Sequence, residues 1–434
     1  MLLRGAAGLC IGSLLLTALG AMQPVEPSSL PITSDLAKAL QTHVRSLADP
    51  SLQGRKPGTQ GNRTAADYIR TRFQAAGLVP LSSLGGYGQG LPAQLGDNLL
   101  GLKPAARTNA QAPYLLVGAH YDHLGGAHLG ADDNASGVAI LIELARSMPA
   151  LRHHHVLFAA FNAEEPPYIR TPRMGSQYFA DHLPPEIGSL DAIQAVVIMD
   201  LMGGVHWDPM REMVFAAGAE KSPGLYRRLK EAASCSSHEM EGVPDAEKGR
   251  RGDAEQAQSP CRRVTASPLA VLPLGLHLIE ELPLIGHVPF SDYDAFRNAS
   301  VPFLFLSGGR TPRYHQPTDL PETLHYERMA ATVRWLQRLL SGIDQDMERY
   351  RFDANRLELA DEVATLQPLA VQAAERDRDI PGTSWLSRRA MQRDAEWLKT
   401  FNPRSPQPED ITRLERLSLR MQCLLADLPV CFLL

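Results

Sequence analysis

The 434-residue sequence lacks the features that mark several classes of protein. Five cysteines are too few for a disulfide-built mini-protein, and 34 glycines are too few for a collagen-like fibre. Lys and Arg (43) do not outnumber Asp and Glu (48), so the basic excess typical of a nucleic-acid-binding protein is missing. A mean hydropathy of −0.18 excludes a protein with several membrane spans. What remains is a large globular chain, for which 44% apolar residues are ordinary.

The first 21 residues have the pattern of a secretory signal peptide. Arg4 supplies a positive charge, an apolar stretch follows over residues 6–18, and small residues up to Ala21 offer a cleavage site. The apolar stretch is too short for a comfortable membrane span. We therefore expect an exported protein, periplasmic or secreted, with an uncleaved N-terminal anchor as the alternative.

Four cysteines follow the signal peptide, namely Cys235, Cys261, Cys423 and Cys431. In an exported chain an even number allows two disulfides, although three pairings are possible from sequence alone. Local pairing, Cys235 with Cys261 and Cys423 with Cys431, is the simplest expectation. Four free thiols are the alternative.

Short apolar runs typical of buried strands alternate with segments that have the three- and four-residue spacing of helices. This alternation predicts an α/β fold with a mixed, mostly parallel central sheet and helices on both faces. We expect this domain to span residues 22–347, with loop insertions near residues 166–174 and 242–267. Residues 348–434 are rich in Leu, Arg and Glu at helical spacing, which predicts a helical C-terminal extension.

Acidic residues and a histidine follow the predicted strands directly. His120 and Asp122 follow one strand, Glu164 and Glu165 follow the next, and Asp200 follows a third. Because sites in open α/β sheets form at the carboxyl ends of the strands, we expect these side chains to meet at one edge. Imidazole and carboxylate ligands suit zinc. Two zinc ions roughly 3.5–4 Å apart would activate a water molecule and polarise the attacked carbonyl.

The order of these motifs resembles that of the co-catalytic di-zinc exopeptidases of metallopeptidase family 28, a group that contains secreted bacterial aminopeptidases and glutamate carboxypeptidase-like enzymes. Residues 52–59 are similar to the family's N-terminal Gly-Arg-x-x-Gly-Thr segment. The ligand motifs then follow in the family's order at residues 118–122, 130–137, 162–165, 199–200 and 314–319. Any one of these short motifs is weak evidence, but five in order, each after a predicted strand or at a helix start, are strong evidence.

The resemblance implies two zinc ions per chain and five ligands, which are His120, Asp133, Glu165, Asp200 and His315. His120 and Asp200 would each ligate one ion. Glu165 and His315 would ligate the other. Asp133 would bridge both ions.

The same resemblance implies two residues that act beside the metal ions. Glu164 would be the general base that takes the proton of the attacking water. Asp122 would accept a hydrogen bond from the His120 imidazole and so fix its tautomer. The family also implies a cis peptide bond between Asp133 and Asn134.

Other polar residues near these motifs have less definite roles. His123 and His128 match no ligand position of the family, so we expect neither to take part in the metal site. Asp292 lies in a segment similar to a family segment near the substrate, although capping a helix is an equal alternative. Asp319 would support His315 or cap the following helix.

Together these features predict an exported zinc-dependent exopeptidase, and within that class an aminopeptidase that hydrolyses N-terminal residues from peptides. The expected partner is a peptide substrate, with no nucleic acid and no stable membrane span. One alternative is a glutaminyl cyclase-type acyltransferase with one zinc ion, against which the intact Ala-Ser-Gly at residues 135–137 argues. The other is a non-catalytic peptidase-like module, and such modules generally lose ligands.

Overall fold

The computed structural model describes residues 32–107, 112–205, 207–237, 269–282, 286–375 and 385–426. The expected signal peptide and the insertion at residues 242–267 lie outside these ranges. So do Cys261, Cys431 and the side chains of Cys235 and Cys423, so the disulfide pairing stays a prediction. Within the described ranges, none of the helices has the length and apolar character that a membrane span requires.

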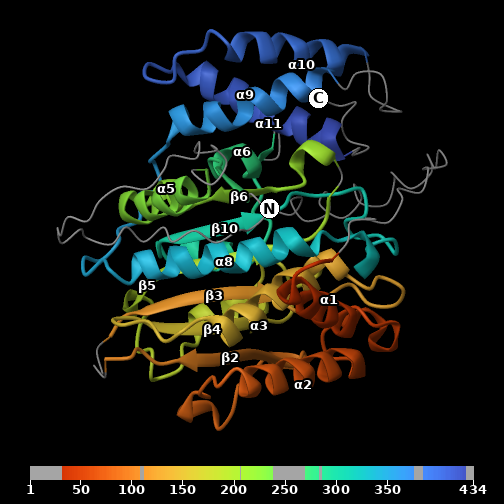
Figure 1. Ribbon diagram of the computed structural model, residues 1–434, viewed down its shortest axis with the longest axis vertical. Helices are drawn as coiled ribbons and strands as arrows, with labels where there is room; N and C mark the ends of the chain where they lie inside the picture. The colour runs from red at the N-terminus through yellow and green to blue at the C-terminus, as the bar shows by residue number, and fades with distance from the viewer. Residues whose placement is uncertain are drawn as a thin grey trace, which may run out of the picture.

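An eight-stranded mixed sheet forms the centre of the molecule, with the strand order β1-β2-β4-β3-β5-β10-β6-β7. Its strands stack along the long axis of the molecule in Figure 1, from β2 near one end to β6 toward the other. The strands are β1 (Gly88–Gly90), β2 (Asp97–Lys103), β3 (Tyr114–His120), β4 (His155–Phe161), β5 (Ile193–Asp200), β6 (Met213–Ala217), β7 (Ala270–Pro273) and β10 (Phe303–Ser307). A separate two-stranded ribbon consists of β8 (Glu281–Leu282) and β9 (Gly286–His287).

The middle of the sheet is parallel, and its flanks are partly antiparallel. β4, β3, β5 and β10 run in one direction, whereas β2 and β6 pair antiparallel with β4 and β10. Every residue of β3 and β5 is buried, as expected for parallel strands that are covered on both faces. The predicted mixed, mostly parallel sheet is confirmed.

Helices cover both faces of this sheet and enclose two separate apolar clusters. One face carries α1 (Asp35–Leu47), α2 (Gln60–Ala75), α3 (Gly137–Ser147), α5 (Pro223–Ser237) and α8 (Tyr326–Ile343). The other face carries α4 (Gly175–Asp181) and α7 (Tyr293–Asn298). The apolar stripe of α8, with Met329, Val333 and Leu336 at helical spacing, is fully buried against the sheet.

The predicted C-terminal extension is helical. It consists of α9 (Leu359–Glu375), α10 (Trp385–Leu398) and α11 (Pro408–Ala426), which lie together at one end of the molecule, in blue in Figure 1. These helices share a third apolar cluster with Leu274 and with Leu278 of the short helix α6 (His277–Glu280). The extension therefore packs directly on the edge of the α/β unit. The boundary at residue 348 stays a prediction.

Candidate active site and metal centre

The candidate site lies at the carboxyl ends of β3, β4 and β5. His120 and Asp200 are the last residues of β3 and β5, and Glu164 and Glu165 follow β4 after a two-residue turn. The strand that follows β3 in the chain, β4, pairs with β3 on one side, and the next strand, β5, pairs with it on the other. Such a reversal of strand order is a topological switch point, where α/β folds bind ligands. The structure thus brings the predicted residues to one edge of the sheet.

One group of potential metal ligands contains His120, Asp133 and Asp200. The Nε2 atom of His120 lies 3.4 Å from Oδ1 of Asp133 and 3.5 Å from Oδ1 of Asp200. All three side chains are buried. Burial by itself would lower the pKa of His120, but the carboxylates of Glu164 and Asp200 raise it well above the ordinary value. The surroundings therefore favour a positive charge at this position.

A second group lies on the other side of Asp133. The Nε2 atom of His315 is 3.2 Å from Oδ2 of Asp133 and 3.1 Å from Oε2 of Glu165. Asp133 therefore turns one carboxylate oxygen toward His120 and the other toward His315. This is the placement that a bridging ligand needs.

His123 also belongs to the second group, so the expectation that it takes no part in the site is wrong. Its Nδ1 atom lies 2.7 Å from Oε1 of Glu165 and 3.9 Å from Oδ2 of Asp133, and the side chain is fully buried. Together with these two carboxylates it could hold a metal ion. The signal that sequence reasoning missed is its position in the same loop, three residues after His120. His128, in contrast, is half-buried and contacts a backbone carbonyl.

Asp122 has a different partner from the one predicted. Its carboxylate is 3.7 Å from Nδ1 of His120, which is too long for a hydrogen bond. The two carboxylate oxygens instead accept hydrogen bonds from the backbone N–H groups of Glu164 (3.1 Å) and Glu165 (3.2 Å). Burial raises the pKa of Asp122 to about 6. Asp122 therefore fixes the turn that presents both glutamates.

Glu164 is a buried carboxyl in strongly negative surroundings. Burial raises its pKa well above the ordinary value, and the charges of Glu165, Asp292 and Asp200 add to this against the opposing effect of the nearby imidazole. Asp292 is itself fully buried, and burial raises its pKa to about 7. It precedes α7, but its side chain makes no capping hydrogen bond. Of the two interpretations of Asp292, the structure supports the one that places it in the site.

Residues 101–259 match the family model described as peptidase family M28. The protein YfbL of Escherichia coli (strain K12), described as uncharacterized, is 27% identical over 292 residues, which cover 62% of this chain and 76% of that protein. The chain resembles peptidase family M28.

Two solved structures have a similar fold. BSAP, a zinc aminopeptidase from Bacillus subtilis, superposes with a TM-score of 0.50 at 14% identity, covering 74% of this chain and 98% of BSAP. LapB from Legionella pneumophila superposes with a TM-score of 0.50 at 16% identity, covering 74% of this chain and 78% of LapB. The predicted family resemblance is confirmed, and the chain is a metallopeptidase-like protein.

Arg55, in the segment at residues 52–59, has a structural role that the sequence did not reveal. Arg55 is completely buried, and its guanidinium donates to the backbone carbonyls of Leu47 (2.7 Å), Tyr121 (2.8 Å) and Gly130 (3.0 Å). It thereby ties the loop that follows β3 to the loop that carries Asp133. Burial lowers the pKa of Arg55 to about 10, so it stays charged at neutral pH.

The loop that carries Asp133 is held by two further carboxylates. The side chain of Asp319 accepts hydrogen bonds from the backbone N–H groups of Asp132 (2.9 Å) and Asp133 (3.1 Å). Oδ1 of Asp132 accepts from the N–H groups of residues 203 and 204. The peptide bond between Asp133 and Asn134 is cis, as the family resemblance implied. The carboxylates of Asp132 and Asp319 thus position the loop through backbone N–H groups.

The donor atoms of the two groups fit bound cations. Several buried polar atoms have no hydrogen-bond partner within the described part of the chain: Nδ1 and Nε2 of His120, Oδ2 of Asp133, Oδ1 of Asp200 and Oε1 of Glu164. Buried polar groups without a partner are costly, and a cation would satisfy them. Nitrogen and oxygen donors in this mixture suit zinc. Each group could hold one ion, with Asp133 between them.

Proposed function

We propose that this chain is an exported zinc-dependent aminopeptidase that removes N-terminal residues from peptides. The observation that carries the proposal is a buried glutamate, Glu164, beside two metal-ligand groups that share Asp133. Export rests on the signal-like pattern of residues 1–21. The fold that the chain shares with BSAP, described as a zinc aminopeptidase, agrees with the proposal.

The residues that would hold zinc divide into two sets. The first set consists of His120, Asp133 and Asp200. The second set consists of Asp133, Glu165 and His315, and His123 adds a nitrogen donor to it. When bound, zinc supplies Lewis-acid polarisation of the scissile carbonyl and lowers the pKa of water at the site.

Glu164 would move the proton. Its carboxyl lies 3.8 Å from Nε2 of His120, at the first metal group. Because burial and neighbouring carboxylates raise its pKa, it can accept a proton from the attacking water and then donate that proton to the leaving amine. The hydrogen bonds from the backbone of residues 164 and 165 to Asp122 keep the carboxyl in place during both transfers.

The variant Glu164→Gln tests this role directly. It removes the proton acceptor and keeps the size of the side chain, so kcat on a peptide substrate should fall by about 10²–10⁴-fold while the zinc content stays unchanged. The exposed Glu396→Gln is the matched control and should keep full activity. A Glu164→Gln enzyme with wild-type kcat would contradict the mechanism.

The glutaminyl cyclase alternative predicts a different product and a different metal content. The second ligand group, in which His315 contacts both Asp133 and Glu165, supports two ions over one. Zinc analysis of the purified chain, together with assays for peptide release and for pyroglutamate formation, separates the two functions. Pyroglutamate formation by a chain with one zinc ion would replace the aminopeptidase proposal.

A further inference from the structure

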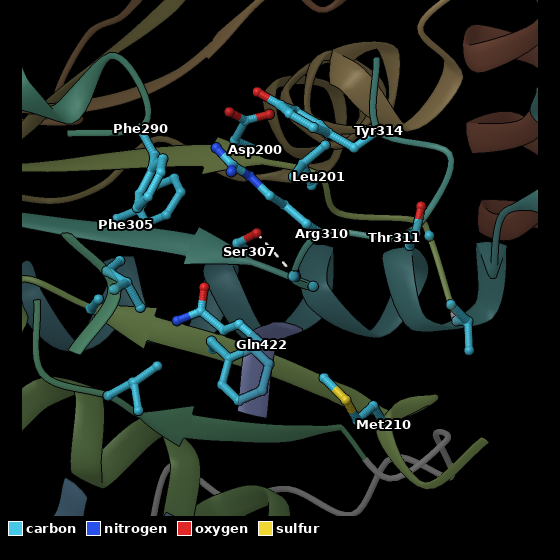
Figure 2. A pocket seen from close by; sticks show the side chains of 18 of the residues that line it. Asp200, Leu201, Met210, Phe290, Phe305, Ser307, Arg310, Thr311, Tyr314 and Gln422 are labelled. Atoms are coloured by element: carbon cyan, nitrogen blue, oxygen red, sulfur yellow. Dashed lines mark hydrogen bonds between the residues drawn. The ribbon is translucent and has the colours of Figure 1, made fainter. Parts of the chain in front are cut away.

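A second cavity lies away from the cavity at the metal centre. The cavity at the metal centre has a volume of ≈ 140 Å³, and its lining includes Asp200 and Met421 of α11. Figure 2 shows the side chains around it. The second cavity, of ≈ 320 Å³, lies among α1, α2 and α3, on the face of the sheet that these helices cover. Of the residues that line it, none belongs to the two metal groups, so a ligand bound there is apart from the metal centre.

Short apolar side chains form much of the wall of this second cavity. The helices α1 and α2 both pack on α3, and the cavity lies where the three meet (Figure 1). Ala39 belongs to α1, Ala75 and Ala76 lie at the end of α2, and Ile142 belongs to α3. Because the three alanines are short, they leave room between the helices. An apolar chain of several carbon atoms suits such a lining.

A buried polar network forms another part of the lining. The ring of His43 lies 2.7 Å from the hydroxyl of Tyr68 through Nδ1 and 3.0 Å from Oε1 of Glu143 through Nε2. Oε2 of Glu143 accepts hydrogen bonds from Nε (2.9 Å) and Nη2 (2.7 Å) of Arg146. Burial opposes the charged carboxylate, but the hydrogen bonds with His43 and Arg146 outweigh it and lower the pKa of Glu143. Glu143 is therefore ionised, and both of its oxygens already have partners.

Arg72 adds a positive charge that this network does not balance. Its Cζ atom lies 4.8 Å from the ring centroid of Tyr68, so the guanidinium rests on an aromatic face. Its Nε–H group is buried and has no hydrogen-bond partner within the described ranges. The lining thus contains two arginines, Arg72 and Arg146, against the single carboxylate of Glu143. The excess positive charge favours an anion in the cavity.

The chemistry of Arg72 narrows the choice of anion. A guanidinium presents its N–H groups as a planar fork that matches the two oxygens of a carboxylate. A buried donor without a partner is costly, and an acceptor on the ligand would satisfy it. The apolar walls stand beside this charge in the same cavity, so the ligand that fits both carries an apolar body next to its anionic group.

We propose that this cavity binds a small carboxylate with an apolar body, with the carboxylate on Arg72 and the body between α1 and α2. A fatty acid and the C-terminal residue of a peptide both have this chemistry. The site is a second binding site of the protein, and it does not depend on the proposed peptidase function.

Calorimetry with hexanoate and hexanol tests the charged half of the proposal. Zinc-loaded wild-type protein should bind hexanoate at least about tenfold more tightly than hexanol, because the alcohol lacks the charge that Arg72 binds. Arg72→Gln should abolish this difference, and Arg72→Lys should restore part of it. Arg45→Gln is the matched control, since Arg45 is an exposed arginine of α1 outside the lining, and this variant should keep the wild-type affinity.

The apolar half is tested by the length of the ligand and by filling the cavity. From butyrate to hexanoate, each added CH₂ group should tighten binding about two- to fourfold. Ala75→Phe should weaken hexanoate binding at least about fivefold, because the ring occupies the cavity. Gln74→Phe, at an exposed position of α2 outside the lining, is its control and should bind hexanoate as the wild type does. N-acetylleucine distinguishes the sources: tighter binding than that of hexanoate assigns a peptide carboxylate, and weaker binding assigns a fatty acid.

Three outcomes would overturn the site. The first is equal binding of hexanoate and hexanol to the wild type. The second is equal binding of hexanoate to the wild type and to Arg72→Gln, which a carboxylate held at the metal centre would give. The third is binding only to a variant that lacks residues 22–31, which would make the N-terminal segment the occupant. Peptide hydrolysis by Arg72→Gln reports on the proposed function separately and should equal that of the wild type.

Discussion

The loops around the metal groups and the three C-terminal helices are held together in different ways. The loops are polar and buried, and specific hydrogen bonds fix them, such as those of Arg55 to three backbone carbonyls and of Asp122 to two N–H groups. The helices α9, α10 and α11 share an apolar cluster. In the loops single hydrogen bonds fix particular backbone groups, whereas in the helices the stabilisation is spread over many apolar contacts.

Because of this difference, single substitutions should have different effects in the two regions. A buried polar group that loses its partner is left unsatisfied, so a single change in the loops should have a large effect on function. A change in the helices should alter stability or the shape of the cavity beside Asp200 by degrees, because neighbouring apolar side chains adjust.

The largest effect is expected at Asp133, which both metal groups share. Asp133→Asn removes the negative charge that faces His120 and His315, so both groups lose affinity for zinc together. Activity should fall by more than about 10³-fold, and zinc analysis after dialysis should give less than half of the wild-type content.

The neighbouring Asp132 supplies the matched control. An asparagine at this position still presents an oxygen to the N–H groups of residues 203 and 204, so Asp132→Asn should keep its zinc and lose about tenfold or less in activity. Equal zinc loss in both variants would mean that the two aspartates act as one structural unit and that Asp133 is no bridging ligand.

The same contrast explains what the sequence could predict. Motifs at strand ends predicted that His120, Glu164 and Asp200 would meet, because parallel strands carry their carboxyl-terminal residues to one edge. The predicted partner of Asp122 was wrong, because sequence spacing does not determine whether its carboxylate lies closer to the His120 imidazole or to the N–H groups of residues 164 and 165. The role of Arg55 was missed because its partners are backbone carbonyls, which have no sequence signature.

The C-terminal helices show the complementary limit. Their helical character follows from the spacing of Leu residues, but their place in the molecule does not. Met421 lies over 200 residues from Asp200 in sequence, yet both line the same cavity. Such a contact arises from the packing of α11 on α6, and packing of this kind is set by the shapes of many side chains together.

An intermediate effect is expected at His123. His123→Asn keeps a polar side chain but removes the nitrogen that lies 2.7 Å from Glu165, so the affinity of the second group for zinc should fall by about 10–100-fold. A titration with a competing chelator measures this as the early loss of one ion per chain. His128→Asn is the control and should release zinc as the wild type does. Unchanged zinc affinity in His123→Asn would limit His123 to a structural role.

The smallest effect is expected in the helices, at the ion triad that attaches them to the α/β unit. His277 contacts Glu362 of α9 through Nε2 (3.0 Å) and Glu415 of α11 through Nδ1 (3.1 Å). Burial opposes the charged imidazole, but the two carboxylates outweigh it and raise the pKa of His277 to about 9. Because the pKa of His277 is raised in the folded state, the triad contributes fully to stability below the unfolded pKa of about 6.5. This contribution is lost as the pH rises through about 9.

The pH-dependent contribution of His277 to the free energy of unfolding is therefore on the order of 3 kcal/mol. The Tm difference between the wild type and His277→Gln should be largest near pH 6 and should shrink toward pH 10. His325→Gln is the control between pH 8 and 10, because the pKa of His325 is lowered to about 4 in the folded state and the histidine is then neutral in both the folded and the unfolded chain. A Tm difference for His277→Gln that is as constant with pH as the one for His325→Gln would mean that packing alone holds the helices to the sheet.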